Sequence, residues 1–200
     1  KAGVDTVVVA GGDGTVSTIG RALLGSEVTL GVIPLGSGNG FARHFGIPLV
    51  PARAVEALYA ATVRRIDVGM VDERPFFVTC SMAWDGAIVR SFNRMPIRGV
   101  LPYVFAGVQE FFEYEPHDMR VVIDGGEERV FRQPMLLTVA NLSQYGGGAR
   151  IAPQAREDDG YLELVVALRQ DMPMLLANFA RFFDGRSGPG HKKETPTAPG

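Results

Sequence analysis

Two glycine-rich turns carry the residues of this sequence that are best suited to chemistry. The first turn reads Gly11-Gly12-Asp13-Gly14-Thr15, and the second reads Gly36-Ser37-Gly38-Asn39. Each follows a run of aliphatic residues typical of a buried strand and precedes a helical pattern. Glycines at such a junction let backbone N–H groups approach a ligand closely. The helix N-terminus adds partial positive charge, so both turns are suited to binding phosphate.

Asp13 makes the first turn more specific than a plain phosphate loop. A carboxylate beside a polyphosphate is repelled unless a divalent cation or a proton donor lies between them, and magnesium is the expected bridge. The alternative is that the Asp13 side chain only caps the tight turn. Neither turn matches the two common phosphate-binding fingerprints, so the spacing alone indicates a nucleotide or phosphate site with a metal.

The elements that must position these turns follow a βα pattern. Strands are expected over 4–10 and 29–35, and helices are expected after each turn and from Pro51 onward, with Thr15 as the cap of the first helix. In a parallel sheet the carboxyl ends of the strands face one crevice, where such folds bind ligands. We therefore predict an α/β domain with a doubly wound parallel sheet over residues 1–63.

The remaining sequence is β-rich. Strands are expected over 64–71, 75–82, 119–123, 130–131, 134–140 and 161–167. Amphipathic helices are expected around 104–112 and 175–183. We predict a β-rich, sandwich-like domain over 64–184. After Asp184 the composition changes to Gly, Pro, Ser, Thr and Lys, which predicts a disordered tail over 185–200.

Composition excludes several classes of function. The formal net charge of −2 gives no electrostatic argument for a nucleic acid partner. Cys80 is the single cysteine, which excludes an internal disulfide and is typical of a reducing compartment. The apolar runs are shorter than a membrane span, and no secretory signal is visible. We expect a cytoplasmic protein that does not bind nucleic acid.

Four blocks, in order, resemble the lipid kinase family that includes diacylglycerol, sphingosine and ceramide kinases. The first two are the glycine-rich turns, and the second continues through Phe41-Ala42-Arg43. The third is Arg65-Ile66-Asp67-Val68-Gly69, and the fourth is 146–155 followed by Asp158-Asp159-Gly160-Tyr161-Leu162. NAD kinases and phosphofructokinases carry turns like the first, so the second block is the one that points to lipid kinases.

This resemblance implies transfer of the γ-phosphate of ATP to a lipid hydroxyl, of the diacylglycerol or sphingoid type, with Mg²⁺ as cofactor. It implies an active site between an α/β domain and a β-sandwich, and peripheral contact with the inner face of the membrane through the lipid. The residues expected to contact ATP are Gly11, Gly12, Gly14, Thr15, Gly36, Ser37, Gly38 and Asn39.

The resemblance also assigns acidic residues. Asp13 would hold or orient the magnesium-bound phosphates or act as the base, and Asp85 would meet the acceptor hydroxyl, with helix capping as the alternative for Asp85. A structural magnesium would bind the Asp159 side chain and backbone near Arg156 and Tyr161. The alternative for this segment is an acidic turn before a strand.

Some residues depart from the family pattern. Gly40 stands where an aspartate is frequent, and Thr18 replaces a glutamate. The family's usual glutamate base would fall beyond Gly200, and its first strand would lie before Lys1, so we expect a chain cut at both ends. His44 is interpreted as a surface residue of the second helix, with approach to a bound phosphate as the alternative. Two alternatives stay open: a kinase of a soluble acceptor such as NAD, and a non-catalytic module that binds nucleotide or lipid.

Overall fold

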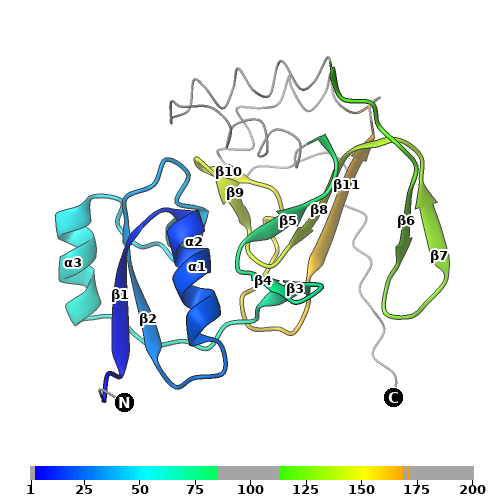
Figure 1. Ribbon diagram of the computed structural model, residues 1–200. Helices are drawn as coiled ribbons and strands as arrows, with labels where there is room; N and C mark the ends of the chain where they lie inside the picture. Colours follow the sequence, from blue (N-terminus) through cyan, green and yellow to red (C-terminus); the bar gives the residue numbers. More distant parts are fainter. Residues whose placement is uncertain (1–2, 85–112, 169–170, 172–200) are drawn as a thin grey trace. The chain divides into compact units, whose positions relative to one another are not determined.

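A computed structural model of the chain describes residues 3–84, 113–168 and 171 (Figure 1). Contacts group the chain into two units. Of the described residues, those within Lys1–Cys80 and Val139–Glu163 form one unit, and those within Ser81–Thr138 and Leu164–Phe182 form the other. The first unit is therefore assembled from two segments that are far apart in the sequence. The linear boundary near residue 63 stays a prediction.

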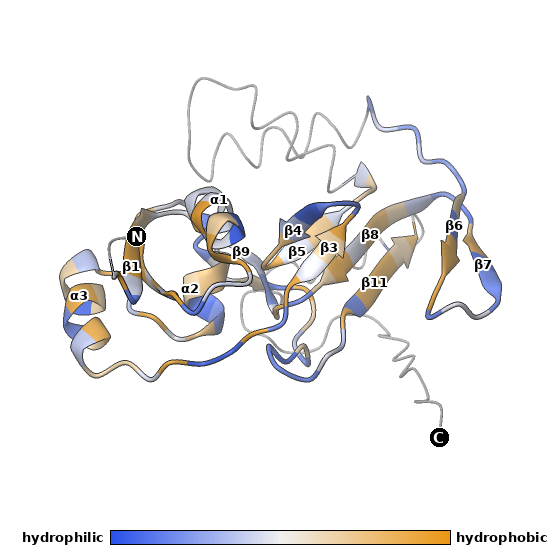
Figure 2. Ribbon diagram, turned by 60° about the horizontal axis from the view of Figure 1, so that its bottom comes forward, coloured by the Kyte–Doolittle hydropathy of each residue, from blue (hydrophilic) through white to orange (hydrophobic). Residues whose placement is uncertain are grey.

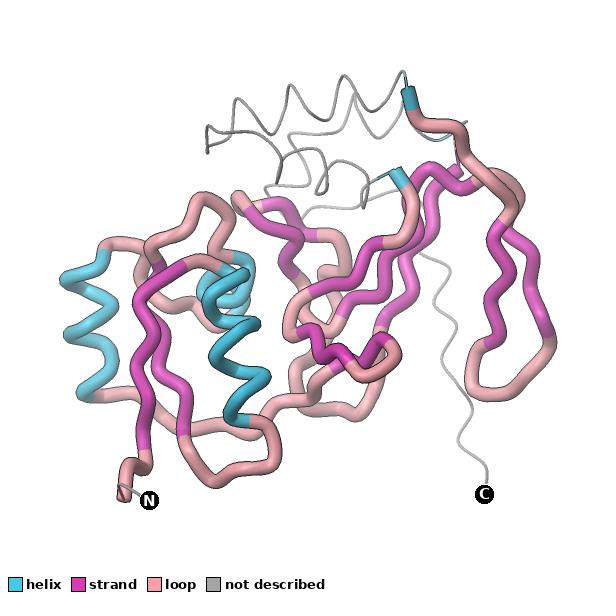
Figure 3. The backbone as a smooth tube through the Cα atoms, viewed as in Figure 1, coloured by secondary structure: helices cyan, strands magenta, loops and turns pink. Residues whose placement is uncertain are grey.

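A parallel pair of strands forms the centre of the first unit. Strand β1 (Thr6–Gly11) pairs with β2 (Thr29–Pro34) along its whole length. Helices α1 (Asp13–Leu23) and α3 (Pro51–Tyr59) lie on opposite sides of this pair, as Figures 1 and 3 show. This arrangement confirms the prediction of an N-terminal α/β region with parallel strands.

The starts of the helices follow from local sequence. Helix α3 begins with Pro51, where the missing N–H is not needed by the helix. The prediction that Thr15 caps α1 is wrong, because the N-cap is Gly12 and no side chain caps this end. Strand β1 runs to Gly11, so only one residue separates it from the helix, and Thr15 falls inside the first turn of α1.

The core of the first unit joins its two sequence segments. Its buried members are Val9, Val16, Val32, Phe41, Phe77 and Leu142. Five of them come from the first segment, including Phe41 of the short helix α2 (Gly40–His44). Leu142 comes from the second segment and is fully buried. Burial of these side chains therefore holds the second segment against the helices that follow the glycine-rich turns.

Strand β3 is shorter than expected and spans only Gly69–Val71. A strand was expected over 64–71, but the backbone groups of Asp67 form hydrogen bonds outside any strand pair. Its N–H donates to the carbonyl of Glu157 at 2.7 Å, and its carbonyl accepts from Asn141 Nδ2 at 2.8 Å. These partners replace a ladder of strand hydrogen bonds and fix residue 67 against the second segment.

Short strands complete the first part of the chain. Strands β4 (Arg74–Phe76) and β5 (Thr79–Ser81) occupy the range where one strand is expected over 75–82. Strand β3 pairs with β4 in antiparallel fashion. Strands β9 (Gln144–Gly146) and β10 (Ala149–Arg150) form a further antiparallel pair that the sequence does not predict.

The second unit contains the predicted hairpin. Strands β6 (Met119–Val122) and β7 (Glu128–Phe131) pair in antiparallel fashion. The turn has left-handed backbone at Asp124 (φ 52°) and at Gly125 (φ 70°). Two consecutive residues with positive φ match the twist of a hairpin, which is why an Asp-Gly pair is favoured there.

A three-stranded sheet has the order β11-β8-β5. Strand β8 (Pro134–Ala140) has the predicted bounds, and β11 (Glu163–Leu168) begins two residues later than expected. Both strands are largely hydrophobic in Figure 2, as expected for strands that contribute to a core. Together with the hairpin, this sheet confirms the prediction of a β-rich C-terminal region.

Three predictions lie outside the described residues: the helices around 104–112 and 175–183, and the tail over 185–200. Within the described residues, none of the helices has the length and hydropathy needed to traverse a bilayer.

Candidate functional site

The two predicted glycine-rich turns lie against each other, backbone to backbone. A Cβ atom added to Gly36 would lie 2.5 Å from the Cα of Gly12, and one added to Gly12 would lie 2.9 Å from the Cα of Gly36. The backbone N–H of Leu35 also donates to the carbonyl of Gly11 at 3.0 Å. Only glycine permits such a close approach of two chains, so the two turns form one continuous surface.

Asp13 bridges the two turns through its carboxylate. Its Oδ2 accepts the backbone N–H of Gly40, and its Oδ1 accepts that of Phe41, both at 2.9 Å. These two N–H groups belong to the first turn of α2 and have no partner within that helix. Asp13 therefore caps a helix 27 residues away in the sequence rather than its own turn.

The second turn is closed by its own asparagine. Asn39 is buried and has left-handed backbone with φ 50°. Its Oδ1 accepts the N–H of Gly36 at 2.9 Å, and its Nδ2 donates to the carbonyl of Gly36 at 2.6 Å. Asparagine tolerates this backbone region better than other residues with side chains. The turn therefore has a fixed shape, as expected for a pre-organised binding loop.

A third glycine-rich turn, at residues 146–148, joins the first two. The carbonyl of Gly38 accepts the backbone N–H of Gly147 at 3.0 Å and the Nε of Arg43 at 3.0 Å. A Cβ added to Gly38 would lie 3.2 Å from Asp13 Oδ2 and 3.6 Å from the Cα of Gly146. The fourth sequence block thus contributes directly to the surface formed by the first two.

Several side chains and backbone groups of these turns face solvent. Gly14, Thr15 and Ser37 are exposed, and Asp13 is partly buried. The structure brings together all the residues predicted to contact ATP, within one unit of the chain. Their contact with a nucleotide stays a prediction. Asp85, the predicted partner of the acceptor hydroxyl, lies outside the described residues.

An open cavity of about 260 Å³ lies beside the third turn. Its lining residues are Arg43, Gly46, Ile47, Leu49, Gln144, Gly148 and Arg150. In the described part of the chain, neither arginine of this cavity forms an ion pair with a carboxylate. Two guanidinium groups without acidic partners make the cavity suited to an anion.

Arg43 and Arg150 were not predicted as site residues, although both occur within the blocks that carry the family resemblance. Their spacing of more than one hundred residues gives no local signal. Only the packing of the second segment against α2 brings them to one cavity.

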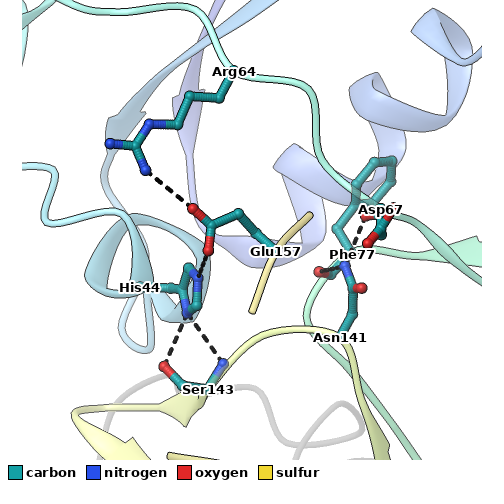
Figure 4. Close-up of polar contacts among 7 residues, drawn as sticks. All are labelled: His44, Arg64, Asp67, Phe77, Asn141, Ser143 and Glu157. Carbon is teal, nitrogen blue, oxygen red and sulfur yellow. Dashed lines mark hydrogen bonds and ion pairs between the residues drawn. The ribbon is translucent and has the colours of Figure 1, made fainter. Parts of the chain in front are cut away.

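His44 is not the surface residue that the sequence suggests, because only 9% of its side chain is exposed. Its ring lies between Ser143 and Glu157, as Figure 4 shows. Glu157 also accepts a hydrogen bond from Arg64 at 3.0 Å. The pKa of the Glu157 carboxyl is lowered by its own backbone N–H, and further by the hydrogen bonds from His44 and Arg64.

The predicted magnesium turn is held by hydrogen bonds of its own. Asp159 Oδ1 accepts the N–H of Tyr161 at 3.1 Å, and Asp67 Oδ2 accepts the N–H of Gly160 at 2.7 Å. The first of these is the contact expected of an acidic turn before a strand. Among residues 3–84, 113–168 and 171, no three acidic, histidine or cysteine side chains are grouped so that they could hold a metal.

Magnesium commonly keeps several water ligands and uses one or two carboxylates. One aspartate and two backbone carbonyls, at Arg156 and Tyr161, supply only oxygen donors and are compatible with that preference. The magnesium site at Asp159 stays a prediction.

Comparison with known families divides the chain into two matches. Residues 1–71 match the diacylglycerol kinase catalytic domain, and residues 79–189 match the YegS C-terminal NAD kinase beta sandwich-like domain. The first match contains the first three sequence blocks, and the second contains the third glycine-rich turn and the predicted magnesium turn.

Individual proteins extend this similarity over most of the chain. A protein of Mycobacterium tuberculosis (strain ATCC 25618 / H37Rv) named "Diacylglycerol kinase" is 34% identical over 190 residues, which cover 92% of this chain and 61% of that protein. A protein of Chromohalobacter salexigens named "Probable lipid kinase YegS-like" is 36% identical over 174 residues, which cover 83% of this chain and 55% of that protein. The chain thus spans about three-fifths of the length of such relatives.

A solved structure shares the fold. The crystal structure of a diacylglycerol kinase from Bacillus anthracis str. Sterne superposes with a TM-score of 0.69 at 24% identity. The match covers 93% of this chain and 62% of that chain.

Proposed function

The chain belongs to the diacylglycerol kinase and YegS-like lipid kinase family, and on this premise we propose that its protein transfers the γ-phosphate of ATP to the hydroxyl of a lipid. Diacylglycerol is the acceptor that we propose first, because the relative from M. tuberculosis bears that name. A sphingoid base is the second acceptor class to be tested.

The observation that carries the proposal is the bridge formed by Asp13. A single carboxylate in the first turn accepts two N–H groups at the start of the helix that follows the second turn. This bridge holds two turns, each suited to phosphate, as one site. A carboxylate has about four acceptor positions, so two remain for a cation that binds together with the nucleotide.

The chemistry needs little covalent participation by the protein. Phosphoryl transfer is accelerated mainly by holding the reactants in line and by neutralising charge on the phosphoryl oxygens. The backbone N–H groups of the exposed Gly14 and Ser37 would orient the phosphates. Thr15 would contribute through its hydroxyl, because its own N–H donates to the carbonyl of Gly12 at 3.0 Å. The guanidinium groups of Arg43 and Arg150, in the adjoining cavity, would add positive charge on the same side of the third turn.

The chemistry that magnesium would supply, when bound with ATP, is neutralisation of the negative charge of the phosphates. Asp13 is the residue of the three turns that could hold it, through the acceptor positions that α2 leaves free. The Asp13 carboxylate would also keep the second turn in place while the phosphates bind. This second role needs no change in its observed contacts.

The test is phosphate transfer from labelled ATP to a panel of lipids by the full-length protein and by Asp13→Asn. In this variant an NH₂ group faces one of the two backbone N–H donors, so one hydrogen bond is lost and two donors oppose each other. We expect transfer to fall by about 100-fold or more, as for loss of a key electrostatic group. Asp124→Asn is the matched control, because Asp124 lies in the exposed hairpin turn, where asparagine is also tolerated.

Three results would decide against the proposal. If the wild-type protein binds ATP but labels no lipid, the non-catalytic module is the better description. Labelling of NAD without labelling of any lipid would favour a kinase of a soluble acceptor. Equal activity of Asp13→Asn and wild type, with equal thermal unfolding temperatures, would show that Asp13 has no role in the site.

A further inference from the structure

His44 makes contacts that join three distant parts of the chain. It lies at the end of α2, and its Nδ1 is 2.9 Å from the Oγ of Ser143. Its Nε2 is 3.2 Å from Oε2 of Glu157. Ser143 and Glu157 are 99 and 113 residues away in the sequence. The ring is largely buried and has partners on both nitrogens, as Figure 4 shows, so it is held in one orientation.

The partners of the ring define where its proton lies. The backbone N–H of Ser143 donates to Nδ1 at 3.1 Å, so Nδ1 must be an acceptor. A neutral imidazole then carries its hydrogen on Nε2, where it donates to the carboxylate of Glu157. This assignment follows from the hydrogen-bond network. A side chain that replaces His44 would have to supply an acceptor on one side and a donor on the other.

The contact with Ser143 helps to hold the third glycine-rich turn in place. The segment 143–148 begins at Ser143, which is bound to His44, and it contains Gly147, whose N–H donates to the carbonyl of Gly38 at 3.0 Å. That same carbonyl accepts from Arg43, the residue before His44. The segment is therefore attached at both ends to residues 38–44.

The contact with Glu157 connects His44 to a different part of the second segment. It links His44 to the turn that contains Asp159, and the carbonyl of Glu157 also accepts the N–H of Asp67 at 2.7 Å. The outer carboxylate oxygen is bound by Arg64, which is 65% exposed. This arm of the network therefore leads away from the glycine-rich turns and toward the surface.

We propose that His44 is a positioning residue for the nucleotide site, and that its bond with Ser143 holds the third glycine-rich turn against the second. The inference rests on the proposed function in one respect, because it predicts an effect on nucleotide affinity. His44 touches no nucleotide in this proposal. It acts through the placement of segment 143–148.

The two arms of the network can be separated by substitution. In His44→Asn, the side-chain oxygen lies near the place of Nδ1 and can accept from Ser143, but the amide is too short to reach Glu157. In His44→Gln, the longer amide can reach Glu157, but it leaves the N–H of Ser143 without a near acceptor. His117, which is exposed, offers matched controls in His117→Asn and His117→Gln.

We expect His44→Gln to raise the KM for ATP by about 10-fold with little change in kcat, since a positioning bond to a half-buried backbone donor is lost. The KM of His44→Asn for ATP should stay within about 3-fold of the wild-type value. If both variants match wild type, or if both lose kcat and thermal stability in parallel, His44 does not position the site.

A second readout does not depend on kinase activity. Ring ¹⁵N shifts should show hydrogen on Nε2 of His44, and amide exchange of Gly147 should quicken in His44→Gln but not in His44→Asn. If the protein neither binds ATP nor transfers phosphate while Gly147 behaves as stated, the proposed function fails and the positioning role stands. Unchanged exchange of Gly147 in both variants overturns the positioning role even in an active kinase.

Discussion

At the scale of single residues, the fold alters the ionisation of the Glu157 carboxylate. Its pKa lies below the ordinary value of 4.5, because its own backbone N–H, the His44 ring and the Arg64 guanidinium all stabilise the charged form. A group whose pKa is lower in the folded protein stabilises the fold above its unfolded pKa. That stabilisation disappears as the pH falls through the folded pKa.

This shift predicts a pH-dependent effect of Glu157→Gln. We expect the variant to lower the free energy of unfolding by ~1.5–3 kcal/mol near pH 7, the size typical of a hydrogen bond to a charged group. The difference from wild type should shrink as the pH falls below about 4.5. Urea unfolding at pH 7, 4.5 and 3 measures it.

Glu27→Gln is the matched control for that experiment. Glu27 pairs with Arg65, but both side chains are almost fully exposed, at 87% and 89%. Exposed pairs contribute little to stability. A Glu157→Gln difference that stays constant over this pH range, or that equals the control, would contradict the assigned cause of the shift.

Single residues also show where sequence reasoning succeeds and where it does not. Asp13 could be selected from the sequence because its neighbours are glycines after a strand. Its partners, Gly40 and Phe41, could not be named, since they depend on how β1 and β2 pair. The burial of His44 could not be predicted for another reason. Helix α2 has only five residues, which is too short a pattern to distinguish a buried face from an exposed one.

At the scale of elements, the two turns behave as one rigid piece because their glycines touch. Gly36→Ala places a Cβ 2.5 Å from the Cα of Gly12 and 2.9 Å from Asn39 Oδ1. Backbone has to move to accommodate it, which typically costs ~1–3 kcal/mol. We expect Gly36→Ala to lower stability by that amount and to weaken ATP binding strongly, as measured by thermal unfolding and by equilibrium binding.

Gly14→Ala provides the control for the stability measurement. A Cβ at Gly14 meets no atom within 4 Å, and the residue lies inside α1, where alanine is favoured over glycine. Its stability should be equal to wild type or slightly higher. If Gly36→Ala proves as stable as Gly14→Ala, the close contact between the turns is not a constraint.

The elements themselves were predicted to different degrees. Long aliphatic runs and strong turn residues gave β1, β2, β8 and the β6–β7 hairpin nearly as observed. The short pair β9 and β10 was missed, because glycines at 146–148 hide any alternation of polar and apolar residues. The strand expected over 64–71 was too long, because the backbone of Asp67 forms hydrogen bonds with Asn141 and Glu157 of the second segment.

At the scale of the whole molecule, every part of the candidate nucleotide site belongs to one unit. That unit combines Lys1–Cys80 with Val139–Glu163. ATP with magnesium should therefore slow amide exchange in three separated stretches, 11–16, 36–44 and 143–150. Exchange in the hairpin of β6 and β7 should not change, because it belongs to the other unit.

Hydrogen exchange followed by mass spectrometry, with and without ATP and magnesium, measures this pattern. Protection confined to the first two stretches would show that the third turn does not belong to the nucleotide site. Protection of the hairpin alone would place the site elsewhere. The sequence predicted the α/β and β-rich halves correctly, but it gave no means of assigning 139–163 to the first unit, because that assignment depends on the burial of Leu142 and its neighbours.

The divided first unit has a consequence for synthesis of the protein on the ribosome. Residues 3–80 emerge first, yet Leu142 of their core and the partners of Gly38 and His44 are still to be translated. At about 5–20 residues per second, the 83 residues from 80 to 163 take roughly 4–17 s. For that time the nascent α/β part exposes apolar surface that its own later segment will cover. The candidate nucleotide site therefore forms only after residues 139–163 have emerged, when part of the second unit has already been translated.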